Sequence, residues 1–251
     1  MLTGNTLWLR RQLLLVAAMM VTMAALTPGQ AAATANPNPG VRPAESKPFG
    51  KSYGEWSALW WQQALAVHEG SGSPFEAGSV DCTALGTGHV AFLVGTTGGA
   101  ASRSCSLPAG TAVLFPLINT ESSIIEGNGT TEAELRTNAD QLADQFTDLT
   151  AVVDGTALSD LGSYRFQSPL FTWTAPVDNV FGVPPTSDPT TAVADGYWIM
   201  LTPLSPGVHT ISFGGAVPNV FTTAATYTIT VTPDHHQPPS LHVSFRSDPA
   251  A

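Results

Sequence analysis

Charged side chains are scarce in this sequence. Only 11% of the 251 residues are charged, and 9 Lys and Arg against 19 Asp and Glu give a net charge of −10. Because binding to nucleic acid or to an anionic membrane surface depends on Lys and Arg, we expect neither as a partner. Thr, Ser, Gly and Pro supply most of the polarity instead, which is typical of exported β-rich domains.

The sequence also lacks the motifs of common catalytic and cofactor sites. It contains no His-Glu-X-X-His, no P-loop and no dinucleotide fingerprint. Gly98 and Gly99 follow an expected strand but do not open a helix, so they do not predict a phosphate site. We therefore expect no cofactor, and we favour a protein without catalytic activity over an enzyme.

The apolar run of residues 13–26 is too short for a comfortable membrane span. It follows Arg10 and Arg11 and precedes a stretch of small residues, which is the order of a signal peptide. We expect cleavage after Ala35, with Ala33 as the alternative. The mature protein would then be secreted or retained in the cell envelope without a stable membrane anchor.

Composition divides the chain into three segments. Residues 1–35 form the expected signal peptide, and residues 36–48 contain four Pro and few apolar residues. The second segment therefore predicts an extended linker, either disordered or strapped along the surface. Residues 49–251 are expected to form a single β-rich domain.

Cysteine is nearly absent. The only two, Cys82 and Cys105, lie in the part expected to be exported, and their spacing matches no metal or redox motif. In an oxidising compartment we expect them to form a disulfide. Closing the 22 residues between them would stabilise the fold by roughly 3 kcal/mol.

Half of the Trp residues are concentrated in residues 52–68, and this stretch predicts a helix. Ser52 and Glu55 have the spacing of a capping box, in which each side chain accepts from the backbone N–H of the other residue. Apolar residues surround nearly the whole helix, so we expect it to be buried on more than one side.

Two interpretations of this helix remain open. Trp56 and Trp60 fall on one face together with Gln63, whereas Trp61 points away from that face. In one interpretation the helix belongs to the core and the Trp rings only fill space. In the other, the rings form the wall of a ligand groove and Gln63 is its polar anchor.

A second helix is expected behind a capping box formed by Thr131 and Glu134. Its apolar face would carry Leu135, Ala139, Leu142, Phe146 and Leu149, and the other face is polar. This pattern indicates a surface helix packed on a sheet.

The remaining apolar segments predict strands. Residues 102–106 are expected to pair with residues 89–95 as a hairpin, and Asp154-Gly155 is expected to turn a second hairpin. Further strands are expected at residues 111–119, 164–166, 170–174, 197–201, 209–213, 226–231 and 241–245. The fold class is therefore mainly β, a β-sandwich of Ig-like or jelly-roll type with the Trp-rich helix and one further amphipathic helix.

Several polar residues are candidates for a site. Asn119 and Glu121 share the alternation phase of the apolar residues in 111–119, although Pro116 predicts an edge or a bulge there. The 14-residue loop that begins at Asp178 has a length common in functional loops. Candidate acids and bases of a hydrolase are Glu55, Glu121, Asp178, Asp195 and His209.

Metal binding has one weak candidate at the C-terminus. Asp234, His235, His236 and His242 are close in sequence. Adjacent His residues on an extended chain point to opposite sides, however, so we favour a solvated turn and expect no metal site.

Four segments together resemble a family of secreted bacterial proteins that has no assigned activity. They are residues 53–62 (Tyr-Gly-Glu-Trp to Trp-Trp-Gln), 115–121 (Phe-Pro-Leu-Ile-Asn-Thr-Glu), 195–198 (Asp-Gly-Tyr-Trp) and 213–215 (Phe-Gly-Gly). The resemblance covers roughly residues 50–231. It implies export and a β-rich domain, and it carries over no catalytic residue.

These observations favour a secreted, non-catalytic module that binds a glycan or another extracellular partner. Trp56, Trp60, Trp61, Gln63 and Asn119 are its candidate binding residues. A secreted hydrolase acting on a glycan or an ester is the alternative, and a structural envelope protein is a third possibility.

Overall fold

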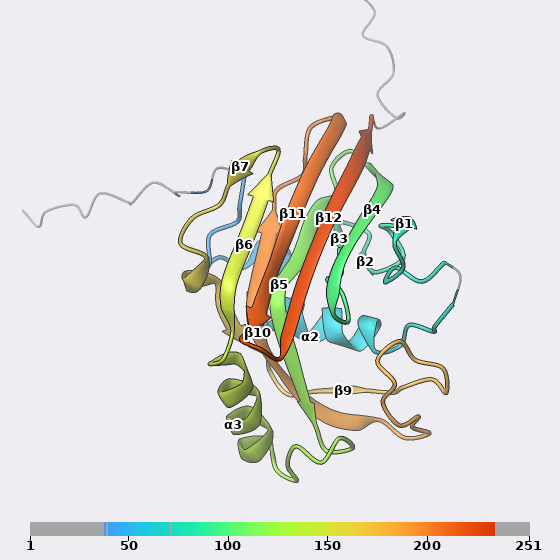
Figure 1. The fold of residues 1–251 in the computed structure, drawn as a ribbon, viewed down its shortest axis with the longest axis vertical. Helices are drawn as coiled ribbons and strands as arrows, with labels where there is room; N and C mark the ends of the chain where they lie inside the picture. Colours follow the sequence, from blue (N-terminus) through green and yellow to red (C-terminus); the bar gives the residue numbers. More distant parts are fainter. Residues whose placement is uncertain (1–37, 39, 71, 234–251) are drawn as a thin grey trace, which may run out of the picture. The chain divides into compact units, whose positions relative to one another are not determined.

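Two six-stranded sheets pack face to face in the computed structural model, which describes residues 38, 40–70 and 72–233 (Figure 1). The expected β-sandwich with two α-helices is confirmed. The elements are η1 (Pro48–Gly50), α2 (Tyr53–Ala64), β1 (Gly78–Ser79), β2 (Gly86–Thr87), β3 (Val90–Phe92), β4 (Gly99–Pro108), β5 (Ala112–Ser123), α3 (Glu132–Ala143), β6 (Thr147–Val153), β7 (Thr156–Ala157), η2 (Leu161–Tyr164), β8 (Arg165–Gln167), β9 (Phe171–Trp173), β10 (Thr190–Leu201), β11 (Gly207–Val217) and β12 (Phe221–Thr232).

Each sheet is named after a long strand. The β12 sheet has the order β1-β4-β12-β11-β6-β7, and the β10 sheet has the order β2-β3-β5-β10-β8, with β9 also pairing with β10. Phe115 of β5 stacks on Phe213 of β11 with ring centroids 4.7 Å apart, which joins the inner faces of the two sheets. Along β12, residues alternate between buried and exposed, so the outer face of its sheet meets water.

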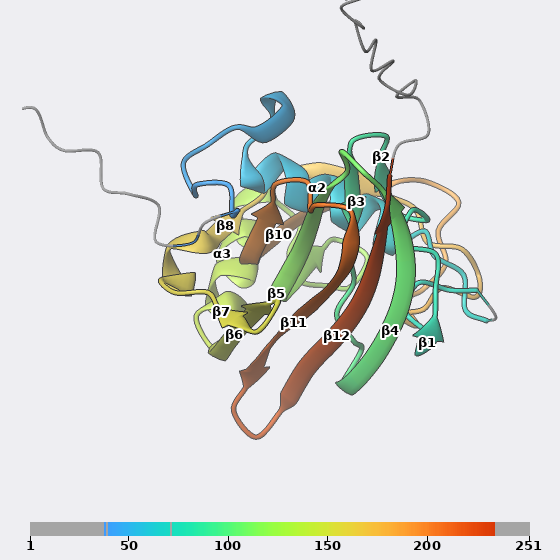
Figure 2. The ribbon, with the colours of Figure 1, turned by 90° about the horizontal axis from the view of Figure 1, so that it is seen from above.

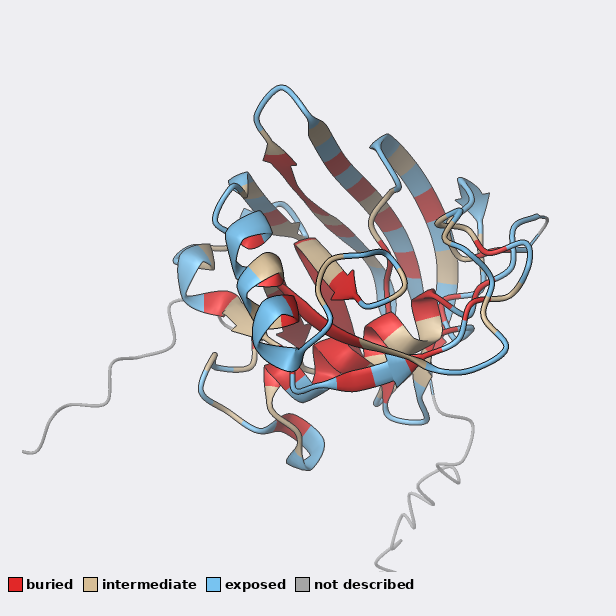
Figure 3. Cartoon of the chain, turned by 90° about the horizontal axis from the view of Figure 1, so that it is seen from below, coloured by how far each residue is buried: buried red, intermediate tan, exposed pale blue. Residues whose placement is uncertain are grey.

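Helix α2 covers the other face of the β10 sheet, which makes the arrangement three layers deep (Figure 2). Ser52 and Glu55 form the expected capping box, and the helix ends at Ala64. Figure 3 shows α2 as largely buried, in contrast to α3. Gly54 lies so close to β8 that a Cβ atom there would be 2.5 Å from the carbonyl oxygen of Gln167.

Helix α3 begins at the expected capping box but is shorter than expected. It ends at Ala143, so Phe146 and Leu149 do not belong to its apolar face, and Leu149 lies in β6 instead. The prediction failed because the chain turns after Ala143, and Leu149 belongs to a strand that pairs with β11. Leu135 and Ala139 pack against Val193 of β10, as expected for a helix on a sheet.

The expected hairpin between residues 89–95 and 102–106 is wrong. Strand β3 pairs in parallel with β5, whereas β4 pairs in parallel with β12 in the other sheet. The burial patterns give the reason: β3 is buried on both faces, but β4 alternates between exposed and buried residues like β12. The expected disulfide between Cys82 and Cys105 is present.

The described part of the Pro-rich segment lies along β10. Val41 forms a bridge with Leu201 and is 3% exposed, and the N–H of Arg42 donates to the carbonyl of Met200 at 2.8 Å. The hydroxyl of Tyr53 donates to the carbonyl of Arg42 and so connects this segment to α2.

Most other strand predictions are confirmed, whereas the strand expected at residues 241–245 lies outside the described residues. Strands β6 and β7 pair across Asp154 and Gly155, both at positive φ, as a two-residue hairpin turn requires. Trp198 and Ile199 lie on opposite faces of β10 and are both fully buried. None of the described helices has the length and hydropathy needed to cross a membrane.

Candidate functional site

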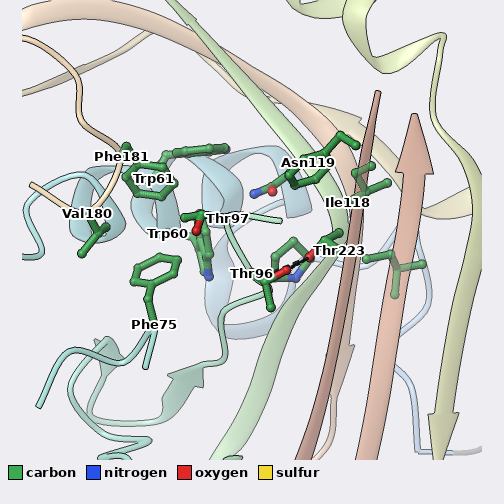
Figure 4. A pocket seen from close by; sticks show the side chains of 14 residues that line it. Trp60, Trp61, Phe75, Thr96, Thr97, Ile118, Asn119, Val180, Phe181 and Thr223 are labelled. Carbon is green, nitrogen blue, oxygen red and sulfur yellow. Dashed lines mark hydrogen bonds between the residues drawn. The ribbon is translucent and has the colours of Figure 1, made fainter. Parts of the chain in front are cut away.

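A cavity of about 300 Å³ lies beside α2, where β5, β12 and two loops meet (Figure 4). Its aromatic side comes from α2 and from the loops before β1 and before β10. Its polar side comes from β5, β12 and the segment after β3. The lining residues are Trp60, Trp61, Phe75, Gly95, Thr96, Thr97, Pro116, Leu117, Ile118, Asn119, Val180, Phe181, Phe221 and Thr223.

Aromatic rings in edge-to-face contact form one wall of the cavity. Trp61 lies 5.1 Å from Trp60 and 5.6 Å from Phe181 between ring centroids, and Phe75 lies 5.3 Å from Phe181. The indole N–H of Trp60 donates to the carbonyl of Leu93 at 2.9 Å, which fixes the ring. Such a wall can stack on a flat or ring-shaped ligand.

Two buried N–H donors of the cavity have no partner. They are Nε1 of Trp61 and Nδ2 of Asn119, and Trp61 is only 7% exposed. Figure 4 shows the Asn119 amide pointing toward the Trp rings. An unsatisfied buried donor costs about 1–3 kcal/mol, so each of these groups favours a ligand that accepts a hydrogen bond.

A β-bulge turns Asn119 into the cavity. Leu117 has no partner on β10, because Trp198 pairs with Pro116 and Tyr197 pairs with Ile118. Ile118 consequently lies against Gly215 of β11, on the side that Phe115 also faces. The expectation that Asn119 shares the phase of Phe115 is therefore wrong, because the bulge reverses the alternation.

Gly196 allows this geometry on the neighbouring strand. It pairs with Asn119, and a Cβ atom at this position would lie 2.6 Å from the Cα atom of Asn119. Any larger residue would push β5 and β10 apart at the edge of the cavity.

No ionisable side chain lines the cavity. Arg103 lies next to lining residue Phe75 and donates to the carbonyl oxygens of Phe75, Glu76 and Val94. Arg103 as a whole is 3% exposed and does not line the cavity, so it can act on a ligand only through its field. The cavity thus suits a neutral ligand.

The loop that carries Phe181 is held against the end of α2. Asp178 accepts from His68 at 2.6 Å, and its carbonyl accepts from the N–H of Glu69. Asn179 folds the loop by donating to the carbonyl of Val183 at 2.8 Å. The hydrogen bond from His68 holds the pKa of Asp178 below its usual value, which assigns this candidate acid to loop anchoring.

Two other candidate acids also have structural partners. Glu55 is exposed and accepts from the N–H and the hydroxyl of Ser52, which lowers its pKa. Asp195 is 2% exposed and pairs with Arg165 at 3.1 Å. Burial raises the pKa of Asp195, while Arg165 opposes that rise.

Glu121 is the candidate acid with the most altered environment. It accepts a hydrogen bond from Nε1 of Trp173 at 2.8 Å and also bonds to the carboxyl group of Glu126. Burial and this second carboxyl group raise its pKa to about 9. It does not line the cavity, so its proton is not directed at a ligand there.

His209 forms a geometry that resembles a catalytic triad. Its Nδ1 lies 2.7 Å from Asp154, and its Nε2 lies 3.4 Å from Oγ of Ser205 but 2.8 Å from the Ser205 carbonyl oxygen. Since a carboxylate and a carbonyl both accept, both ring nitrogens carry hydrogen, and the hydrogen bond to Asp154 raises the pKa of His209. An imidazolium cannot take the proton of Ser205.

The candidate acids and bases are therefore dispersed. No hydrogen bond or ion pair joins any two of Glu55, Glu121, Asp178, Asp195 and His209, all of which the structure describes. In the described part of the chain, no group of three or more His, Cys, Asp and Glu is placed to hold a metal ion. The weak C-terminal candidates, Asp234, His235, His236 and His242, lie outside the described residues.

The candidate binding residues divide into two groups. Trp60, Trp61 and Asn119 line the cavity. Trp56 is 1% exposed and donates to the carbonyl of Pro48, so it belongs to the core. Gln63 bonds to both the N–H and the carbonyl of Gly86 and is not in the lining.

Sequence reasoning missed the residues that complete the cavity. Phe75 and Phe181 come from loops, and Thr96 meets Thr223 only because β4, which begins three residues after Thr96, pairs in parallel with β12. The one sequence signal was the length of the loop from Asp178 to β10, which contains Phe181.

Comparisons with known proteins identify no relative. No family model matches the chain, and no curated protein matches it in sequence. One solved structure, titled "Solution Structure of Amebosin", aligns over 58% of this chain and 100% of its own length, with 12% identity and a TM-score of 0.21. A similarity this low carries no argument about fold or function.

Proposed function

We propose that this protein is an exported, non-catalytic binding module that holds one ring of a neutral glycan in the cavity beside α2. The observation that carries the proposal is the cavity lining itself. Trp61, Phe75 and Phe181 offer aromatic faces, two N–H donors lack partners, and no lining side chain is ionisable. Sugar rings have apolar faces that stack on aromatic rings and oxygen atoms that accept hydrogen bonds.

Export is part of the proposal. The signal-peptide pattern of residues 1–35 favours it, and the disulfide between Cys82 and Cys105 is compatible with an oxidising compartment.

The hydrolase alternative has less support. A hollow of about 400 Å³ next to His209 is lined by Asp154 and by apolar residues such as Leu158 and Leu204. The imidazole is nevertheless occupied at both nitrogens, so the general base that ester hydrolysis needs is not in place.

A glycan array combined with tryptophan fluorescence titration of the purified protein tests the proposal. We expect binding of a neutral glycan to change the Trp emission, because Trp60 and Trp61 line the cavity. Phe181→Ala removes part of the wall and should weaken binding roughly ten-fold.

Val177→Ala is the matched control. Val177 lies in the same loop region, is 86% exposed and does not line the cavity, so its removal should leave affinity unchanged. A silent array together with unchanged Trp emission would reject glycan binding and leave the structural envelope protein as the better explanation.

A further inference from the structure

We infer that the ligand presents a carbonyl group joined to a methyl group, as in the acetamido substituent of an N-acetylated sugar. The inference rests on the proposed function and narrows its ligand class. It starts from the two buried N–H donors of the cavity that have no partner.

The buried polar atoms of the cavity lining that lack a partner are both N–H donors. Nε1 of Trp61 and Nδ2 of Asn119 have no partner. Two of the three Thr hydroxyls in the lining already have partners: Oγ1 of Thr96 donates to the carbonyl of Gly99 at 3.0 Å, and Oγ1 of Thr223 accepts from the N–H of Thr96 at 2.9 Å. A carbonyl oxygen suits this inventory because it only accepts and has two lone pairs, whereas a sugar hydroxyl also needs an acceptor.

Charge distinguishes a carbonyl from other acceptors. A carboxylate or phosphate would also accept from both N–H groups, but no cationic side chain lines the cavity to offset its desolvation. Arg103 is buried behind Phe75 and forms no ion pair with the described residues. Its field favours the negative end of a neutral dipole, which in an acetamido group is the carbonyl oxygen.

The aromatic wall accounts for the methyl group. Trp61, Phe75 and Phe181 contact one another around the space next to the unpaired donors. A methyl group on these rings buries apolar surface without a polar penalty. A volume of about 300 Å³ lies at the small end of ligand pockets, which fits one substituted sugar residue better than a long chain.

Calorimetric titration with two matched trisaccharides tests the inference. One is the β-1,4-linked trimer of N-acetylglucosamine, and the other is the β-1,4-linked trimer of glucose, which differs only in carrying hydroxyl groups in place of the acetamido groups. We expect the acetylated trimer to bind at least about ten-fold more tightly, because a hydroxyl that accepts from these donors must also find an acceptor for its own hydrogen, whereas a carbonyl does not.

Two variants connect this preference to the donors. Trp61→Phe removes the indole N–H but keeps a ring, and Asn119→Leu removes the amide with little change in shape. Each should reduce the preference for the acetylated trimer roughly five- to ten-fold. Gln62→Leu is the control, because the amide of Gln62 donates to the carbonyl of Thr172 outside the cavity. Thermal melting of every variant checks that it folds.

Each contrary outcome has a distinct meaning. Equal affinity for the two trimers, or an unchanged preference in both folded variants, overturns the acetamido inference and leaves glycan binding intact. An N-acetylated dipeptide that binds as tightly as the acetylated trimer overturns the sugar as the source of the carbonyl. Failure of both trimers and of every array glycan overturns the proposed function together with this inference.

Discussion

The carboxyl group of Glu121 lies near the end of β5, where it accepts from Trp173 and bonds to the carboxyl group of Glu126. Two carboxyl groups in one hydrogen bond must share a proton, and burial disfavours the charged form of Glu121. Its pKa is therefore raised to about 9. In the unfolded chain the same group ionises near its ordinary value of 4.5.

We predict that Glu121→Gln stabilises the protein above neutral pH by about 1 to 3 kcal/mol. The folded wild type holds a proton that the unfolded chain releases, so its stability is full below a pH of about 4.5 and is lost as the pH rises toward about 9. The Gln amide is neutral, can accept from Trp173 and can donate to Glu126. Urea titrations near pH 5, 7 and 9 measure the difference.

Glu45→Gln is the control for this experiment, because Glu45 is exposed and should change the stability little at any pH. If the pH dependence of unfolding is the same in Glu121→Gln and in the wild type, the proton on Glu121 does not contribute to it.

Single residues also show how far sequence reasoning reached. Ser52 and Glu55 were predictable as a cap because the capping box depends only on local spacing. Asn119 was identified as a candidate, but its orientation was not, since the bulge at Leu117 reverses the side-chain alternation. Pro116 predicted a bulge or an edge, yet a proline does not specify which residue remains unpaired.

At the scale of elements, α2 and the β10 sheet depend on a close approach of their backbones. Gly54 in the first turn of α2 faces Gln167, and this contact places Trp60 and Trp61, about two turns further along, at the cavity. The glycine of the Tyr-Gly-Glu-Trp segment thus has a packing role that the helical pattern alone did not reveal.

We predict that Gly54→Ala destabilises the protein by about 1 to 3 kcal/mol, although Ala favours helices more than Gly does. The new Cβ atom would lie 2.5 Å from the carbonyl oxygen of Gln167, so α2 must move away from β8. Thermal unfolding followed by circular dichroism measures the effect.

Gly162→Ala provides the comparison, because no atom lies within 4 Å of the Cβ position there. Equal melting temperatures for the two variants would show that α2 can shift without cost and that the close approach is not required.

At the scale of the whole molecule, the disulfide and the sheet pairings determine which segments meet. Cys82 follows β1, and Cys105 lies in β4, so the bond attaches the loop region that contains Phe75 to the edge of the β12 sheet. The hydrogen bonds from Arg103 to the carbonyls of Phe75 and Glu76 hold the same region. One wall of the cavity is therefore fixed by β4.

We predict that replacing both Cys82 and Cys105 by Ala lowers the free energy of unfolding by roughly 3 kcal/mol, because the unfolded chain regains the entropy of the open loop. Denaturant titration of the variant and of the wild type, each with and without reductant, measures the loss. The reductant should affect only the wild type, and a loss well below about 1 kcal/mol would contradict the prediction.

The sequence by itself determined the local features: both helix caps, the Asp154-Gly155 hairpin, the alternating strands β11 and β12, and a mainly β fold. These follow from interactions between residues a few positions apart. Only the tertiary structure decided which strands pair and where Asn119 points, because parallel pairing of β4 with β12 and the bulge in β5 depend on contacts between distant segments. The cavity is a product of those contacts, so its aromatic and polar sides became recognisable as one site only in the folded chain.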